Sequence, residues 1–558
     1  MASVLVVAPF FLIGLGAVPF DDPGEGMHAE IARELVVSGD PLRLTLNGVR
    51  YVDKPPLLYV LLAGAFAVGG AGEAAARVVP ALAGLVAVAA TALLGARLLG
   101  ARCGLVAGIA LGTSWGFFVY GRYVRPETLF VAALATGFAL LLTGLLDNRR
   151  GLVALGLTAF GVAGLAKDPL GALLPPVAVG LSLWVCGGVR PVSRWLPVSG
   201  LAALLVVGLG WYVAVSLTTP GFAWYTVVDN HVLNVARARR FPDEDVPLSA
   251  LEFLSVGAVG ALPWLVPAAA VVWRLARRRA WRQPDEVAWT ILTVWTLGVF
   301  TATALSGFRL PHYALPAYPA IALLAARGWA ELDARRLALA HAAVFGVLGA
   351  ACGFAWLHGA SALTGVVDAT DVATRKAASA GSATLDPAVF VPLLGVTALV
   401  FAGGALLLAA LAVVRRRAAA TYAVIATVLL VLPSVAAGLA ASASSRAVRP
   451  LALALRARLA PGDVVVHEGP LENAGALEWY GGVRPIIVDG RRSVLGFGAT
   501  RADAAETFWE RERLAAAWRG ERRVWLVTGR TPAASVAGTL PSARLAASAG
   551  GRRLYVNR

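Results

Sequence analysis

Long apolar stretches alternate with short polar ones along the first 445 residues of this chain. A run of about 20 apolar residues forms a helix long enough to cross the hydrocarbon core of a bilayer. The runs fall at residues 4–20, 76–100, 103–119, 128–146, 151–165, 169–187, 196–216, 251–273, 288–306, 311–327, 338–357, 389–413 and 420–440. This pattern predicts an α-helical polytopic membrane protein with about thirteen transmembrane helices.

The last part of the chain, residues 446–558, has a different pattern of shorter elements. Three short apolar runs are typical of buried strands, and two longer stretches have helical periodicity. The expected strands are Val464–His467, Arg484–Asp489 and Arg523–Thr528, and the expected helices are Ala447–Leu459 and Ala504–Arg519. We therefore expect a transmembrane domain over 1–445 and a small C-terminal α/β domain over 446–558, accessory to the chemistry.

Three longer polar segments interrupt the apolar runs, at 21–75, 217–250 and 358–388. The first of them has helical periodicity in Met27–Val37 and again in Leu57–Val68. Helices of this kind, with one apolar face, lie in the plane of a membrane surface. We expect the first segment to form two such helices beside the bundle.

Charge defines the expected topology. The chain has 558 residues, of which 58% are hydrophobic and 15% charged, and its net charge is +16. The basic residues cluster in short gaps between apolar runs, which marks the cytoplasmic face and argues against nucleic-acid binding. The clusters are Arg97 and Arg102, Arg149 and Arg150, Arg190 and Arg194, Arg274 to Arg282, Arg327 to Arg336, and Arg415 to Arg417. The N-terminus is then cytoplasmic, and an odd number of helices places the C-terminal domain outside. The run at 4–20 has no basic stretch before it and no cleavage site after it, so we expect a retained helix.

A few basic residues fall on the predicted outer side, against this charge bias. They are Lys54, Arg122, Arg125, Lys167 and Arg309. The chain has only three lysines, so Lys54 and Lys167 stand out among its many arginines. Their side chains either extend to lipid headgroups or bind a specific anion, and a lipid phosphate suits their predicted place at the water–lipid boundary.

Carboxylates accompany these cations. Asp22 and Glu25 precede the first expected surface helix, where they either cap it or take part in chemistry. Glu127 stands at the start of the fourth long apolar run. Glu30 and Glu34 are spaced four residues apart on one helix face, which we interpret as solvated. A carboxylate near a cation can accept a proton from an attacking hydroxyl group while the cation binds a leaving phosphate.

Other kinds of site are weakly indicated. His28, His231 and His312 fall in or beside the outer segments without metal-ligand spacing. The three cysteines suggest neither a disulfide framework nor a metal site. The sequence contains no Gly-rich phosphate-binding loop between a strand and a helix. We therefore expect chemistry that needs no bound nucleotide.

Several motifs resemble the bacterial protein O-mannosyltransferase-like family, which includes the aminoarabinose lipid A transferases. The resemblance is strongest over 1–330. The motifs are DPGEGMHAEIARE at 22–34, SGD at 38–40, LNG at 46–48, YVDKPPL at 51–57, RYVRPE at 122–127, GLAKDP at 164–169, NH at 230–231 and FRLPHYALP at 308–316. One departure is Gly24, where the family usually has an aspartate beside the position of Glu25.

The resemblance implies the GT-C fold and an inverting glycosyltransferase in the bacterial inner membrane. Its donor would be a polyprenyl-phosphate sugar, and its acceptor lipid A, a protein or another envelope glycan at the periplasmic face. The implied catalytic residues are Glu25, Asp22 and Glu127, and the implied substrate-binding residues are Lys54, Asp53, Arg122, Tyr123, Lys167, His231, Arg309, His312 and Tyr313. If Asp22 and Glu25 are both inert, the chain is a degenerate member.

The resemblance calls for no organic cofactor, and it leaves open whether a divalent metal ion binds. Membrane lipids are the remaining expected partners.

The alternative to a glycosyltransferase is a non-catalytic lipid flippase or transporter, which would place charged residues along a path through the bilayer. The apolar runs contain almost none, so the sequence favours the enzyme. The sequence does not identify the sugar or the acceptor.

Overall fold

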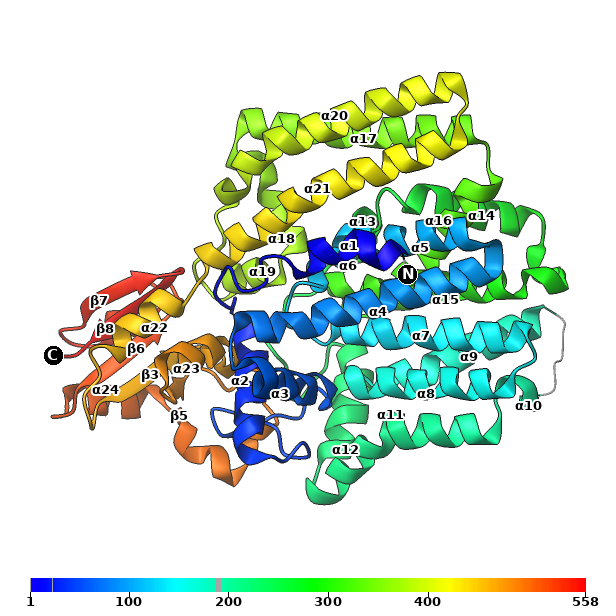
Figure 1. Ribbon diagram of the computed structural model, residues 1–558. Coiled ribbons are helices and arrows are strands. Elements are labelled where there is room, and N and C mark those ends of the chain that lie inside the picture. Colours follow the sequence, from blue (N-terminus) through cyan, green and yellow to red (C-terminus); the bar gives the residue numbers. More distant parts are fainter. Residues whose placement is uncertain (1, 23, 187–191) are drawn as a thin grey trace.

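The computed structural model describes residues 2–22, 24–186 and 192–558, so the predicted basic loop at Arg190 lies outside the described residues. A bundle of long helices forms most of the molecule, and a sheet with short helices forms the rest (Figure 1). The helices of the bundle are α1 (Ala2–Leu12), α4 (Glu73–Leu99), α5 (Ala101–Thr113), α6 (Trp115–Tyr120), α7 (Glu127–Leu146), α8 (Arg150–Ala166), α9 (Leu170–Val185), α10 (Val192–Trp195), α11 (Val198–Thr218), α13 (Ala250–Gly260), α14 (Leu265–Arg277), α15 (Val287–Leu305), α16 (Tyr318–Glu331), α17 (Ala334–His358), α20 (Val391–Val414) and α21 (Arg417–Ser445).

The apolar runs of the sequence fall on these helices, because only a helix satisfies all backbone hydrogen bonds within one segment in lipid. In the described part of the chain, seven helical stretches are long and apolar enough to cross a membrane, or eight if the bent pair α13 and α14 is one span. The pair bends by 109°. Five further apolar helices, including α1, α5 and α8, are shorter. The polytopic helical fold is confirmed, while the number thirteen remains a prediction.

Glycines allow neighbouring helices to approach closely. A Cβ atom on Gly104 of α5 would lie 2.4 Å from the backbone oxygen of Ala92 on α4. A Cβ atom on Gly161 of α8 would lie 3.0 Å from the backbone oxygen of Leu204 on α11. Small residues at such contacts let the backbones of membrane helices pack directly. This close packing stabilises the association of helices in lipid, where the hydrophobic effect does not act between them.

The C-terminal domain is built on a six-stranded mixed sheet. Its strand order is β5-β4-β3-β6-β8-β7, with β3 to β6 parallel and β7 and β8 antiparallel. The strands are β3 (Val464–Glu468), β4 (Ile486–Val488), β5 (Phe508–Trp509), β6 (Val524–Thr528), β7 (Arg544–Ala549) and β8 (Arg552–Val556), and the helices are α22 (Arg449–Arg456), α23 (Gly475–Gly481) and α24 (Arg511–Arg519). The predicted α/β class is confirmed. The helix expected over Ala504–Arg519 begins only at Arg511, because residues 502–507 form a 3₁₀ turn and Phe508–Trp509 pair with β4.

The first polar segment does not lie on the surface as expected. It contains α2 (Gly24–Ser38), the small hairpin β1 (Thr45–Leu46) and β2 (Val49–Arg50), and α3 (Leu57–Gly69). Of the fifteen residues of α2, eleven are buried, because α3 and the C-terminal helix α23 both pack against it. The surface-helix prediction for Met27–Val37 is therefore wrong. By contrast, α3 keeps exposed apolar side chains such as Val60 and Val68.

The long polar segments gather at one end of the bundle, together with the C-terminal domain. Figure 1 shows α2 and α3, α12 (Phe222–Trp224), and α18 (Thr364–Thr370) with α19 (Val372–Ser379) at this end. Residues far apart in the sequence therefore meet where the helices end. This arrangement brings the charged motifs of several segments into one site.

Candidate active site

Lys54 and Asp53 lie between the hairpin β1–β2 and α3. The ammonium group of Lys54 contacts the carboxylate of Asp53, and Pro55 and Pro56 follow directly. Asp53 also accepts hydrogen bonds from Tyr225 Oη at 3.3 Å and from Asn230 Nδ2 at 3.4 Å. Burial alone would raise the pKa of Asp53, but the Lys54 ammonium lowers it below its ordinary value. The two side chains form a partly buried ion pair, in which 28% of the Lys54 side chain and 14% of the Asp53 side chain are exposed.

Glu127 forms a second centre, at the start of α7. Its carboxylate lies 3.4 Å from Arg125 Nε, 3.5 Å from Lys167 Nζ and 3.3 Å from His312 Nε2. Glu127 is only 2% exposed. A buried carboxylate is tolerated when nearby cations compensate its charge, and here the guanidinium group of Arg125 and the ammonium group of Lys167 do so. Glu127 therefore holds Arg125, Lys167 and His312 around one point.

A third group lies where α8 ends and the π-helix Tyr225–Leu233 begins. Lys167 Nζ lies 5.3 Å from the centre of the Tyr313 ring, a cation–π distance. Asp168 follows Lys167, and its carboxylate lies 3.1 Å from His231 Nε2. Burial lowers the pKa of His231, but the hydrogen bond to Asp168 raises it above the ordinary value. Asp168 therefore favours the protonated form of His231.

Electrostatics join these groups into one site. Burial lowers the pKa of Lys54, while Asp53 beside it, together with Asp168 and Glu127, raises the pKa above its ordinary value. Lys54 thus lies within the field of carboxylates from three separate segments. We call the set Asp53, Lys54, Arg125, Glu127, Lys167, Asp168, His231, His312 and Tyr313 the cationic site.

Seven of the predicted site residues lie in the cationic site: Asp53, Lys54, Glu127, Lys167, His231, His312 and Tyr313. The predicted catalytic residues Asp22 and Glu25 have other partners. Glu25 accepts two hydrogen bonds from Arg77, at 2.8 and 2.6 Å, and one from the backbone of Val124 at 3.1 Å. Asp22 accepts from the backbone of Ala476 at 3.2 Å. In the described part of the chain, no hydrogen bond or ion pair joins either acid to the cationic site.

Arg122 and Arg309, which we expect to bind phosphate, donate to backbone carbonyl groups at helix ends, and their role toward phosphate stays a prediction. Arg122 donates to the backbone oxygens of Phe10, Phe11 and Ile13, which lie at the C-terminal end of α1. Arg309 donates to the backbone oxygens of Leu248, Ala304 and Ser306. Helix C-termini leave carbonyl groups without partners inside the helix, and a guanidinium group satisfies several at once.

Tyr123, the remaining predicted residue, occupies the space beside Gly24. A Cβ atom on Gly24 would lie 2.6 Å from the hydroxyl oxygen of Tyr123, and this hydroxyl donates to Asp21 at 3.1 Å. A side chain at position 24 therefore requires Tyr123 to move. This contact gives a physical account of the glycine where the resembling family has an aspartate.

Sequence reasoning missed the hydrogen-bond partners of this site. Asp168 and Tyr225 were not singled out, and Asn230 was noted only as part of a motif. A signal for Asp168 was available, because the residue directly follows a lysine at a helix end. Tyr225 and Asn230 lie on a π-helix, an element that is rare and frequent at functional sites.

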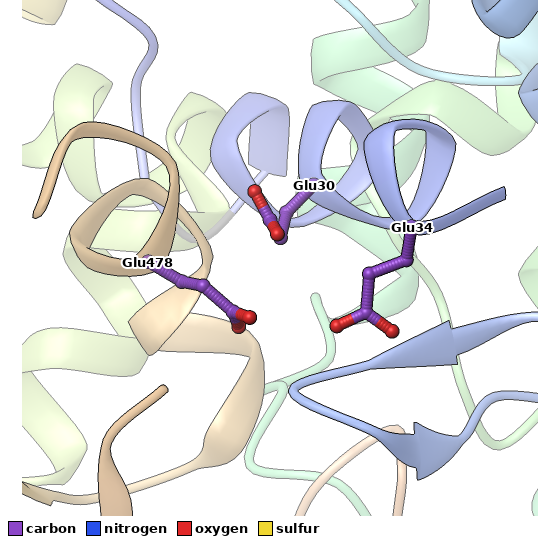
Figure 2. Close-up of side chains that lie close together, drawn as sticks. All are labelled: Glu30, Glu34 and Glu478. Atoms are coloured by element: carbon purple, nitrogen blue, oxygen red, sulfur yellow. The ribbon is translucent and has the colours of Figure 1, made fainter. Parts of the chain in front are cut away.

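Glu30, Glu34 and Glu478 converge between α2 and α23, as Figure 2 shows. The prediction of a solvated face is wrong, since Glu30 is 1% and Glu34 8% exposed beneath the C-terminal domain. Arg33 contacts Glu30 at 2.7 Å, and Arg484 contacts Glu34 at 3.1 Å and Glu478 at 3.3 Å. Among the described residues, these carboxylates are the group close enough together to hold a metal ion, but two guanidinium groups already compensate most of their charge.

Comparisons with known proteins show which proteins this chain resembles. Residues 53–211 match the family model described as dolichyl-phosphate-mannose-protein mannosyltransferase. An undecaprenyl phosphate-alpha-4-amino-4-deoxy-L-arabinose arabinosyl transferase of Pseudomonas fluorescens is 28% identical over 345 residues, which are 58% of this chain and 56% of the relative. The corresponding transferase of Pseudomonas aeruginosa is 28% identical over 339 residues, covering 58% of each chain. The chain thus matches a little over half the length of these curated relatives.

Solved structures resemble the whole chain. ArnT from Cupriavidus metallidurans, bound to undecaprenyl phosphate, superposes with a TM-score of 0.79 at 21% identity, covering 100% of this chain and 97% of that one. The Archaeoglobus fulgidus oligosaccharyltransferase, tethered with an acceptor peptide, gives a TM-score of 0.51 at 12% identity over 94% of this chain and 68% of that one. The GT-C fold is confirmed, and so is the resemblance predicted from the motifs.

Proposed function

We propose that this chain is an inverting glycosyltransferase of a bacterial inner membrane. It moves a sugar from a polyprenyl-phosphate donor to an acceptor of the envelope, at the periplasmic face. The observation that carries the proposal is the cationic site, where Arg125 and Lys167 flank Glu127 and the same carboxylate helps to raise the pKa of Lys54. The resemblance to a transferase fold bound to undecaprenyl phosphate supports it.

Lys54 and Lys167 are the groups that would bind the donor phosphate. Each places an ammonium group near the site, and both side chains are partly exposed, at 28% and 14%. As the bond between the sugar and the phosphate breaks, negative charge grows on the departing phosphate. A fixed cation in a site of low dielectric stabilises that charge strongly, so these lysines lower the barrier of the step.

Glu127 would position these cations rather than accept a proton. Its carboxylate already contacts Arg125, Lys167 and His312, and its pocket is closed to water. A carboxylate held by three such partners is a poor base, because a proton would have to compete with all of them. Its removal would release Arg125 and Lys167 from their common centre.

Asp53 is the described carboxylate best placed to act as base, in preference to Asp22 and Glu25. It contacts Lys54 directly, and its hydrogen bonds to Tyr225 and Asn230 are long. When the donor phosphate takes over the Lys54 ammonium, the main influence that lowers the pKa of Asp53 weakens. The acceptor oxygen then attacks the anomeric carbon, its proton passes to Asp53, and the phosphate leaves with the electron pair.

The test is transfer by the purified protein in detergent, with a radiolabelled polyprenyl-phosphate sugar and an extract of envelope acceptors. We expect labelled acceptor and free polyprenyl phosphate in equal amounts. A lipid flippase or transporter would move the donor across vesicles without breaking its glycosidic bond. Movement without cleavage would overturn the proposal, and the labelled acceptor would identify the acceptor class.

A further inference from the structure

A cavity of about 90 Å³ lies between the C-terminal sheet and the polar segments of the bundle. Its floor is the end of β3 at His467 and Glu468, and one wall is the end of β6 at Arg530. Residues 373–385, which include α19, cover it from the bundle side, and Ala383 hydrogen bonds to the backbone oxygen of Gly529 at 3.2 Å. We call it the switch-point cavity.

Its position follows a general rule for parallel sheets. From β3 the chain continues to β4 and β5 on one side, and it then returns to β6 on the other side. In open α/β sheets, ligands bind beyond the carboxyl ends of the strands at the point where the strand order reverses. The cavity lies at this point, between the ends of β3 and β6.

Polar groups without protein partners point to a ligand. Both ring nitrogens of His467 lack a hydrogen-bond partner among the described residues, although His467 is only 2% exposed. The same holds for Arg446 Nε and for Asn473 Oδ1, which also line the cavity. Buried polar groups are nearly always hydrogen-bonded in native proteins. A group that accepts hydrogen bonds from His467 and Arg446 would satisfy both.

The lining decides the class of ligand. Four basic side chains converge on the cavity from four segments, namely Lys376, Arg446, Arg530 and Arg552. They disfavour a metal ion, and the described lining has no Phe, Tyr or Trp ring on which a sugar could stack. We propose that the switch-point cavity binds a phosphate group, either free phosphate or the phosphate of a larger molecule. This inference is independent of the proposed transfer.

Two ion pairs and a hydrogen bond to the backbone hold three of the basic side chains in place before a ligand arrives. Lys376 donates to Glu472 at 2.7 Å, Arg530 to Glu468 at 3.0 Å, and Arg552 to the backbone oxygen of Asn473 at 2.6 Å. Each cation keeps further N–H groups for an oxyanion. Fixed donors lose little conformational freedom on binding, which favours affinity.

Three acids line the cavity, and Glu468 is already paired with Arg530. The other two, Asp22 and Glu244, are compatible with an anion. Burial raises the pKa of Asp22 to about 7, although Arg552 lies beside it, and burial also raises the pKa of Glu244. A protonated carboxyl group donates a hydrogen bond to a phosphate oxygen. Asp22 and Glu244 therefore add donors when they carry a proton.

Binding of inorganic phosphate to the purified full-length protein tests the proposal. Titration calorimetry is run on Lys54→Ala protein to weaken phosphate binding at the cationic site, and the cavity variants separate any binding that remains there from binding in the switch-point cavity. His467→Leu removes the unpartnered imidazole, and Ala383→Trp narrows the exposed rim. Ala378→Trp places the same bulk on an exposed position of α19 that does not line the cavity. In a second arm, the protein is placed in nanodiscs of phosphatidylcholine with or without phosphatidic acid. The lipid that the protein retains after delipidation is then measured.

We expect one phosphate site whose affinity falls on the order of tenfold or more in His467→Leu and Ala383→Trp, as for a lost hydrogen bond to a charged group. Ala378→Trp should bind like its parent. Selective retention of phosphatidic acid, lost in the same two variants, would support the proposal with a lipid as the source. Absence of phosphate binding in both arms, or binding that neither variant weakens, would overturn it.

Discussion

At the scale of single residues, Lys54 carries the largest expected effect on activity. Lys54→Ala should lower the transfer rate by about a hundredfold or more, comparable to losing one donor to a transition-state charge. Lys54→Arg should recover only part of the rate, because the planar guanidinium group differs in size and hydrogen-bond geometry from the compact ammonium beside Asp53. Initial rates with a saturating lipid-linked donor measure both. Near-normal turnover in Lys54→Ala would remove Lys54 from the site.

Arg122 offers a contrasting prediction. Because its guanidinium group satisfies three carbonyl oxygens at the end of α1, Arg122→Ala should lower stability by about 1–3 kcal/mol. Turnover per folded molecule should stay at the wild-type value. Thermal unfolding in detergent and an assay normalised to folded protein separate the two readouts. A loss of turnover without a loss of stability would return Arg122 to the substrate-binding residues.

Glu25 is expected to act through stability as well. Its ion pair with Arg77 is buried, with side-chain exposures of 1% and 5%, and breaking such a pair from one side costs about 3–5 kcal/mol. Glu25→Gln should therefore unfold at a much lower temperature. The double variant Glu25→Gln with Arg77→Leu should regain part of this loss, because it leaves no unpaired charge. A stable but inactive Glu25→Gln would instead make Glu25 catalytic.

At the scale of elements, the contact between α2 and α23 depends on pH. Burial, together with the neighbouring carboxylates of Glu30 and Glu34, raises the pKa of Glu478 to about 9. The folded state therefore holds a proton that the unfolded chain releases near its ordinary pKa. The contribution of Glu478 to the free energy of unfolding is fully present below about pH 4.5 and is lost as the pH rises toward 9.

Glu478→Gln should remove this dependence. We expect the variant to lose less stability than wild type between pH 6 and pH 9, measured by thermal unfolding at several pH values. Glu506→Gln is the matched control, because the Glu506 side chain is 86% exposed. If the unfolding temperature changes with pH equally in wild type and Glu478→Gln, then Glu478 stays ionised in the folded protein.

The elements also show what the sequence could and could not predict. Apolar runs gave the helices, because a chain in lipid has few alternatives to a helix. The spacing of Glu30 and Glu34 correctly predicted that both side chains lie on one face of α2. It could not predict that this face is buried, because Glu478 and Arg484, which pack against it, lie more than 400 residues later. Lys54 and Lys167 were found because lysine is rare here, whereas Arg122 and Arg309 bind helix ends that a sequence does not locate to the residue.

At the scale of the whole molecule, the predicted topology is directly testable. A reporter fused after Arg558 should be periplasmic, and one fused after Arg278 should be cytoplasmic, because the basic clusters mark the inner face. Alkaline phosphatase and fluorescent-protein fusions report the two sides independently. A cytoplasmic C-terminus would place the cationic site on the wrong face for an envelope acceptor.

The first polar segment and the last domain hold each other in place. Asp22 bonds Ala476, Asp21 pairs with Arg446 at 2.7 Å, and Glu34 pairs with Arg484. The ribosome makes these partners at opposite ends of synthesis, since chains fold from the N-terminus as they emerge. The segment that carries Lys54 therefore reaches the membrane early in synthesis, but it gains these contacts only after the C-terminal domain has been made. A chain stalled or truncated after Ser445 would insert its helices and yet keep Asp22 and Glu34 without those partners.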